Sequence, residues 1–169
     1  MKEIFTRSSI RQFQDKEVEK EKILQILKAG MQAPSACNQQ PWEFFVIENK
    51  ETISKLSLVS PHSSCAKGAP VIIVPVYHKD NLTCPEYAQI DMAIAMENMW
   101  LETTSLGLGG VWLGIAPNIY RMKQVKEILK LDDNLEPFSL FPIGYKATEK
   151  KQDDRFDRKR IHFDRERKK

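Results

Sequence analysis

Apolar side chains recur along this chain at two different spacings, and each spacing predicts a different kind of element. Apolar residues at three- to four-residue intervals predict helices over residues 2–6, 19–31, 50–59, 87–106 and 118–131. Runs rich in β-branched and aromatic residues predict strands over 43–48, 70–77, 108–115 and 137–145. Because helices and strands alternate, we expect an α/β or mixed α+β class, with helices on the faces of a sheet.

Three of the predicted elements lead to more specific expectations. The continuous apolar run at 70–77 is typical of a central strand buried on both faces, in which Pro75 should lie at a bulge or an edge. The helix at 87–106 is apolar on more than one stripe, so either part of it meets a partner subunit or it is a central core helix. The helix at 118–131 should direct five apolar residues inward: Ile119, Met122, Val125, Ile128 and Leu129.

Length and composition narrow the class of protein. A chain of 169 residues suits one domain, spanning 1–169, and 41% hydrophobic with 29% charged residues is typical of a globular protein rather than a disordered one. No apolar run suits a signal peptide or a membrane span, so we expect a cytoplasmic protein without a membrane partner. The odd number of cysteines, three at wide spacings, indicates reduced thiols and no metal site.

Charge is unevenly distributed, although the net charge is only +3. Basic residues crowd the C-terminal segment 146–169, but acidic residues interrupt the run. That mixture argues against a nucleic-acid-binding arm, and the last few residues are expected to form a solvated or frayed tail.

Two polar clusters could carry chemistry. Arg7 and Arg11 bracket two serines, which supplies the cations and hydroxyl donors that a phosphate monoester requires, although exposed arginines beside a helix are the simpler interpretation. The second cluster lies between two prolines at residues 33–42. Its three consecutive amides, at 38–40, could pair with the edge of a heteroaromatic ring such as a flavin, or it could be an ordinary loop with Trp42 in the core.

The sequence lacks the residue sets that other common kinds of catalytic site require. Cys37 has no evident base, so we interpret it as structural, and the three histidines are scattered without paired carboxylates. Neither a dinucleotide-binding glycine motif nor a P-loop occurs. Redox chemistry would therefore need a cofactor that is held by other means.

Three segments in this order, 7–13, 33–44 and 106–114, together resemble the nitroreductase family, and Gly144-Tyr145 with residues 154–157 extend the likeness over nearly the whole chain. The resemblance implies a mixed α+β nitroreductase-like fold in an intertwined homodimer, with one FMN at each end of the interface. It also implies NADH or NADPH as electron donor and a small-molecule oxidant.

The resemblance further implies which residues hold the flavin. The phosphate and ribityl chain would be held by Arg7, Ser8, Ser9 and Arg11, and Arg155 would close on the phosphate. The ring would meet Pro34, Ser35, Ala36 and Asn38 of the other subunit and, at N5, the backbone of Trp112, Leu113 and Gly114. No residue is assigned as an acid or base. Two positions depart from the family pattern: Asp153 stands where many relatives have lysine, and Ala36 where many have serine.

The implied reaction is a two-step exchange that reduces a nitroaromatic, a quinone or a similar small molecule. Three alternatives stay open: a non-catalytic FMN-binding or storage protein, a reductive dehalogenase on the same fold, and a nucleic-acid-binding protein acting through its basic tail. Residues 58–67 and 78–85 are the loops that we expect to bear on substrate access.

Overall fold

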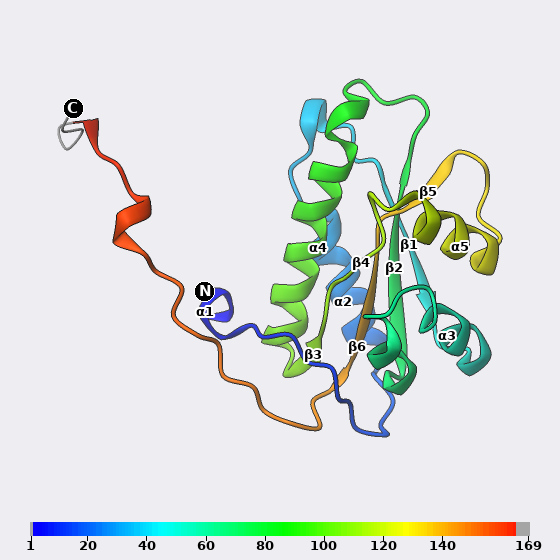
Figure 1. Ribbon diagram of the computed structural model, residues 1–169, viewed down its shortest axis with the longest axis horizontal. Helices are drawn as coiled ribbons and strands as arrows, with labels where there is room; N and C mark the ends of the chain where they lie inside the picture. The colour runs from blue at the N-terminus through cyan, green and yellow to red at the C-terminus, as the bar shows by residue number, and fades with distance from the viewer. Residues whose placement is uncertain (1, 165–169) are drawn as a thin grey trace.

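The computed structural model describes residues 2–164, so residues 165–169 of the predicted basic segment lie outside the described part. A six-stranded antiparallel sheet forms the centre of the molecule (Figure 1). Its main path runs through β1 (Trp42–Ile47), β2 (Val71–His78), β6 (Ser139–Tyr145) and β3 (Leu108–Gly110). Two short strands complete it: β4 (Leu113–Gly114) pairs with β6, and β5 (Leu135–Pro137) pairs with β2.

Helices cover both faces of this sheet, which confirms the predicted α+β class. The helices are α1 (Glu3–Thr6), α2 (Lys20–Met31), α3 (Lys50–Leu56), α4 (Ala88–Ser105) and α5 (Ile119–Leu129). Figure 1 shows α2 and α4 on one side of the sheet and α3 and α5 on the other. Each predicted helix is present, although the one expected over 50–59 ends at Leu56.

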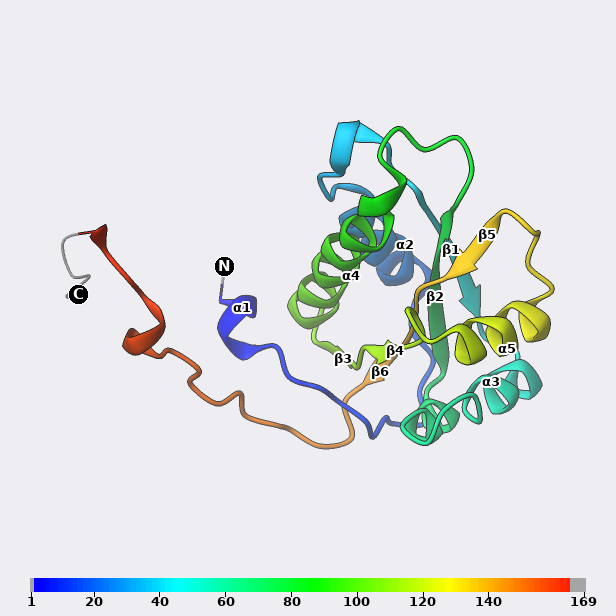
Figure 2. The same ribbon diagram turned by 45° about the horizontal axis from the view of Figure 1, so that its top comes forward.

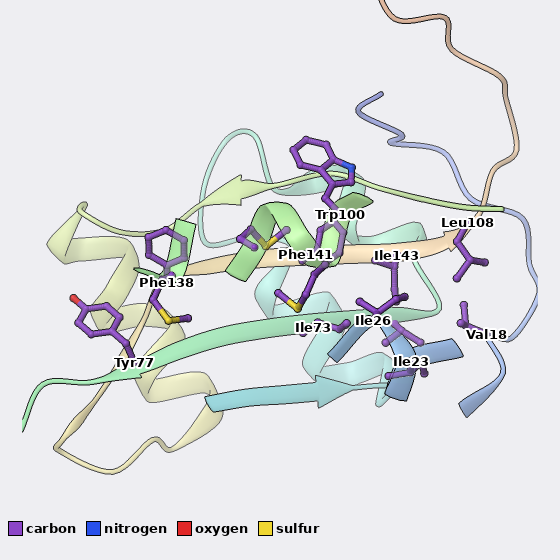
Figure 3. Packing of buried hydrophobic residues seen from close by; sticks show 14 of the residues in the cluster. Val18, Ile23, Ile26, Ile73, Tyr77, Trp100, Leu108, Phe138, Phe141 and Ile143 are labelled. Carbon is purple, nitrogen blue, oxygen red and sulfur yellow. The ribbon is translucent and has the colours of Figure 1, made fainter. Parts of the chain in front are cut away.

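Strand β2 supplies both hydrophobic cores because successive side chains of a strand point to opposite faces. Val71 and Ile73 pack in the core beneath α2 and α4, whereas Ile72 and Val74 pack in the core beneath α3 and α5. Figure 3 shows the first core, in which Phe141 of β6 lies at the centre. The continuous apolar run is therefore a central strand buried on both faces, as predicted.

Pro75 lies at a bulge, as predicted. The register against β2 shifts by one residue between the pairs Ile73–Phe141 and Val76–Pro137, so that three residues, 138–140, lie opposite two of β2. Strand β2 pairs with β6 through Val71–Ile73 and with β5 through Val76–His78, so Pro75 falls where β2 changes partner. Its carbonyl accepts a hydrogen bond from the Phe138 N–H at 2.9 Å. The missing N–H of proline costs no ladder bond at this break.

The same break divides the strand predicted over 137–145. Phe138 separates β5 from β6 because the chain leaves one section of β2 and joins another. The strand predicted over 108–115 is likewise divided into β3 and β4 around Val111 and Trp112.

Two helices leave apolar side chains exposed. Helix α4 buries one stripe against the sheet, including Met92 and Met96, but exposes Ile90 and Ile94 at 54% and 36%, so a single chain does not bury it all round. The prediction that Ile119 faces inward is wrong, since it is 77% exposed at the first turn of α5. Only Val125 of that helix is fully buried.

The C-terminal end of the chain lies outside this layered body. Beyond β6 the chain extends away from the sheet, and its short 3₁₀ turn at Arg158–Arg160 lies far from the helices (Figures 1 and 2). Apolar side chains on this extension, Phe156 and Phe163, are 72% and 55% exposed. Within residues 2–164, no helix combines the length and apolar character needed to cross a membrane.

Candidate functional site

The N-terminal segment that carries Arg7 to Arg11 is held against the sheet by its backbone. The Ile10 N–H donates to the Gly110 carbonyl at 3.0 Å, and Ser9 forms a parallel bridge to Gly110. A side chain at Gly109 would place its Cβ 2.6 Å from Cγ1 of Ile10, so only glycine allows this close approach. Ser8 and Ser9 are half-buried in the same segment.

Arg7 is a largely buried cation with unused hydrogen-bonding capacity. Its guanidinium lies 4.0 Å from the centre of the Trp100 ring, and its Nε is 3.8 Å from the Glu97 carboxylate. Burial raises the pKa of Glu97, an effect that the nearby Arg7 opposes. The Nη1 atom of Arg7 is buried without a hydrogen-bond partner among the described residues. A buried cation with a free donor favours an anionic ligand.

Arg11 lines a cavity of about 480 Å³ together with the backbone of the β4 region. The described residues around it include Trp112, Leu113 and Gly114, and none of those that line it is acidic. A Cβ at Gly114 would meet no atom within 4 Å, so this backbone faces open space. With two arginines and no acid among the described residues of its lining, the cavity therefore favours a ligand with negative charge.

Several residues of this cavity were not identified from the sequence. They are Ser60, Pro61, His62, Ser64, Cys65 and Arg121. The first five belong to the 58–67 loop, which we had expected to bear on substrate access. Nothing in the pattern indicated Arg121, whose Nη1 donates to the Gly114 carbonyl at 3.1 Å, because it looks like an ordinary polar residue of α5.

The loop between Pro34 and Trp42 is anchored to the start of α4 by side chains. Asp91 is 2% exposed, and its two carboxylate oxygens accept from the Ala36 N–H at 2.9 Å and from Nε2 of Gln39 at 2.6 Å. Gln39 also pairs with both backbone groups of Cys84, each at 3.0 Å. Trp42 packs against the first core, as predicted.

This anchoring maintains an unusual backbone. Cys37, Asn38 and Gln40 have positive φ angles of 52°, 52° and 45°, a left-handed conformation that costs non-glycine residues roughly 1–2 kcal/mol each. Pro34 and Asn38 are exposed at the surface of the loop, while Ser35 and Ala36 are half-buried. Cys37 is exposed rather than packed as a structural residue.

Within one chain the structure does not bring the two clusters together. The Ala36 N–H donates a hydrogen bond to Asp91. Arg7 instead lies beside Glu97 and Trp100, which are six and nine residues farther along α4. That separation amounts to about 9–14 Å along the helix axis. Arg155 lies on the exposed C-terminal extension, and within residues 2–164 no hydrogen bond or ion pair joins it to either cluster.

Metal chemistry has no evident donor set in the described part of the chain. Among residues 2–164, no group of three or more histidine, cysteine, aspartate and glutamate side chains is placed to hold a metal ion. The polar groups gathered at the site are three arginines, His62, hydroxyls and backbone groups.

Comparison with known proteins connects this geometry to a family. The sequence pattern of the Nitroreductase family matches residues 4–60 and 56–145. A Methanothermobacter thermautotrophicus protein, provisionally named NADH dehydrogenase/NAD(P)H nitroreductase, is 38% identical over 95% of this chain and 84% of its own length. An Archaeoglobus fulgidus protein of the same name is 39% identical over 96% of this chain and 95% of its own.

Solved structures agree. A Clostridium acetobutylicum protein, provisionally named NADH oxidase, is 47% identical, with a TM-score of 0.93 over 96% of this chain and 98% of its own. An FMN-dependent nitroreductase from Clostridium difficile is 33% identical, with a TM-score of 0.89 over 96% and 97%. On the family match and these likenesses, the chain belongs to the nitroreductase family of oxidoreductases.

Proposed function

We propose that this protein is an FMN-dependent oxidoreductase that uses NADH or NADPH to reduce a small molecule such as a nitroaromatic or a quinone. On this proposal residues 1–169 form one FMN-binding domain. The observation that carries it is the buried Nη1 of Arg7, a cationic donor that lacks a partner among the described residues and so fits a phosphate group. Among similar structures, one from Desulfovibrio desulfuricans, 28% identical with a TM-score of 0.81, contains FMN.

The residues of the site would divide the binding of FMN between them. Arg7, with the hydroxyls of Ser8 and Ser9, would hold the phosphate and the ribityl chain, and Arg155 would close on the phosphate. Arg11 would lie toward the N1 and O2 side of the ring, where a positive charge stabilises added electrons. The backbone of Trp112, Leu113 and Gly114 would face N5.

When bound, FMN supplies the two-electron carrier that takes hydride at N5 from the nicotinamide and passes it to the oxidant. The chain's own contribution is orientation and electrostatics, because none of the site residues has been assigned as an acid or base. Arg121 holds the Gly114 carbonyl at 3.1 Å and so fixes the orientation of the peptide expected beside N5. Trp112 and residues of the loop at 58–67 line the cavity, where they would limit the access of water to the bound ring.

The second half of each site would come from a partner subunit. The loop that carries Pro34, Ser35, Ala36 and Asn38 is anchored at Asp91, about 9–14 Å along α4 from the residues that contact Arg7. We therefore propose that these four residues contact the flavin of the other copy. The exposed Ile90 and Ile94 of α4, together with the apolar side chains of the C-terminal extension, would form the interface of this homodimer.

A reconstitution experiment tests the proposal. Purified protein is loaded with FMN, freed of excess cofactor and mixed with NADH or NADPH without oxygen, while the visible flavin absorbance is followed. We expect the absorbance to fall and then to recover when a nitroaromatic or a quinone is added. Sedimentation should show a dimer.

Each other outcome contradicts a part of the proposal. Retained flavin that neither nicotinamide reduces would indicate a storage protein, and recovery only with a halogenated phenol would indicate a dehalogenase. Failure to retain FMN, with salt-dependent retention on DNA, would favour binding of nucleic acid through the tail.

A further inference from the structure

Two cysteines that are distant in the sequence meet at the surface of the loop between Pro34 and Trp42. The Sγ atoms of Cys37 and Cys84 lie 2.6 Å apart, although 47 residues separate them. Cys84 is the residue before the short 3₁₀ turn Pro85–Tyr87, which leads directly into α4. Both thiols are free in this structure.

The meeting of the two sulfurs is built into the backbone rather than left to mobile side chains. Gln39 donates from Nε2 to the Cys84 carbonyl and accepts from the Cys84 N–H, both at 3.0 Å. Asp91 fixes the other side of Cys37 through the Ala36 N–H at 2.9 Å. The residues that flank Cys37 are thus tied to the same short stretch that carries Cys84.

The two thiols differ in their surroundings. Cys37 is exposed, and its left-handed backbone, with φ of 52°, presents it outward. Cys84 is half-buried, and the hydrogen bond with Cys37, followed by burial, raises the pKa of Cys84 to about 11. At neutral pH Cys84 therefore stays a thiol, and Cys37 is the sulfur that a dissolved oxidant reaches first.

We propose that Cys37 and Cys84 are a redox-convertible pair, which a peroxide closes to a disulfide and a dithiol reductant reopens. Cys37 attacks the peroxide as the thiolate, breaks the O–O bond and becomes a sulfenic acid with release of one water. Cys84 then attacks the oxidised sulfur, forms the S–S bond and releases the second water. Two thiols lose two electrons and two protons in all, and one hydrogen peroxide becomes two waters.

Closure of this bond would add a covalent link to the hydrogen bonds of Gln39 and Asp91. The linked segment contains Ala36 and Asn38, so the oxidation state of the pair would set how firmly this loop is fixed to the start of α4. The chemistry of the pair does not require flavin. Its test therefore stays separate from the test of the proposed function.

The experiment treats the full-length protein with hydrogen peroxide, blocks the remaining thiols with an alkylating reagent and maps the peptides without reduction. We expect one linked pair of peptides, containing Cys37 and Cys84, and an alkylated Cys65. The melting temperature should rise on oxidation because the closed loop restricts the unfolded chain. Dithiothreitol should restore both alkylation sites and the original melting temperature.

Serine variants provide matched controls. In Cys84→Ser neither the link nor the rise in melting temperature should appear, whereas Cys65→Ser should still form the link and show the rise. Cys65 is a suitable control because it lies away from the pair, in the cavity that Arg11 lines, where its Sγ donates to the His62 carbonyl. A link that includes Cys65, a disulfide between two chains, or separate sulfinic acids at Cys37 and Cys84 would overturn the proposal. The mapping of the wild type alone decides this even if a variant fails to fold.

Discussion

The two segments expected to meet the flavin are fixed in opposite ways. The Arg7 to Arg11 segment is held by backbone pairing with Gly110, and its largely buried Arg7 side chain keeps a donor without a partner among the described residues. The loop between Pro34 and Trp42 is held by the side chains of Asp91 and Gln39, and its strain lies in the backbone.

Because of this difference, we expect substitutions in the two segments to affect different properties, ligand binding in one and folding stability in the other. Where the backbone holds the segment, its side chains are free to bind a ligand, and a substitution should change binding more than folding. Where side chains hold the backbone, removal of an anchor should change folding first and binding only as a consequence. Single substitutions on each side test this division.

The largest effect is expected for Asp91→Ala. The variant leaves the Ala36 N–H and the Gln39 amide without their buried carboxylate partner. Hydrogen bonds to a charged group contribute about 1.5–3 kcal/mol each, so the free energy of unfolding should fall by about 3 kcal/mol. Urea unfolding followed by circular dichroism measures this loss.

Glu86→Ala provides the control for that variant, because Glu86 is an exposed acid near the start of the same helix. Its effect should stay within about 0.5 kcal/mol, as for most surface substitutions. Equal stability of Asp91→Ala and Glu86→Ala would show that the loop is held by something other than its carboxylate anchor.

Arg7→Ala should act on binding instead. Loss of its charge-assisted contact with the phosphate should weaken FMN binding by about 2 kcal/mol, which is about 30-fold. The change in unfolding free energy should be smaller than for Asp91→Ala, because the Nη1 donor has no partner among the described residues and the variant removes only the contact with the Trp100 ring and the 3.8 Å ion pair with Glu97. Fluorescence titration of the flavin-free protein with FMN measures the affinity.

Lys123→Ala removes an exposed cation of α5 and controls for the general effect of charge. Its FMN affinity should equal that of the wild type. If Arg7→Ala unfolds as readily as Asp91→Ala but binds FMN normally, the division between the two segments is wrong.

The same division explains which parts of the molecule the sequence made predictable. The Arg7 to Arg11 cluster is local, so it could be recognised in the sequence as a candidate phosphate site, although exposed arginines were the simpler interpretation and only the family resemblance assigned the role. The anchors of the other loop depend on contacts between distant segments, and Asp91 in the first turn of a helix looks like a surface acid. The proximity of Cys37 and Cys84 arises from the fold in the same way.

Periodicity predicted the helices and the central strand but not how they end or change partner. The division at Phe138 depends on β2 exchanging one neighbour for another, which no local pattern records. Ile119 fits the apolar spacing of α5, yet the first turn of that helix lies beyond the edge of the core and leaves its side chain exposed.

The smallest effect is expected where a side-chain link merely supplements backbone pairing. Just after the N-terminal segment, the Gln14 N–H donates to the Tyr145 carbonyl at 2.9 Å, and Oη of Tyr145 donates to Glu19 at 2.7 Å. This hydrogen bond from Tyr145, assisted by Lys22, lowers the pKa of Glu19 from 4.5 to about 2. A carboxyl group with a lowered pKa stabilises the fold above pH 4.5, and that contribution is lost as the pH falls toward 2.

Glu19→Gln should therefore lower stability slightly at neutral pH, and its difference from the wild type should shrink as the pH falls from 4.5 toward 2. Urea midpoints measured across this range test the expectation, with Glu17→Gln as the exposed neighbouring control. A difference that stays constant with pH would show that Glu19 acts through packing rather than through its charge. A loss as large as that of Asp91→Ala would mean that the N-terminal segment also depends on side chains for its position, and the contrast between the two segments would fail.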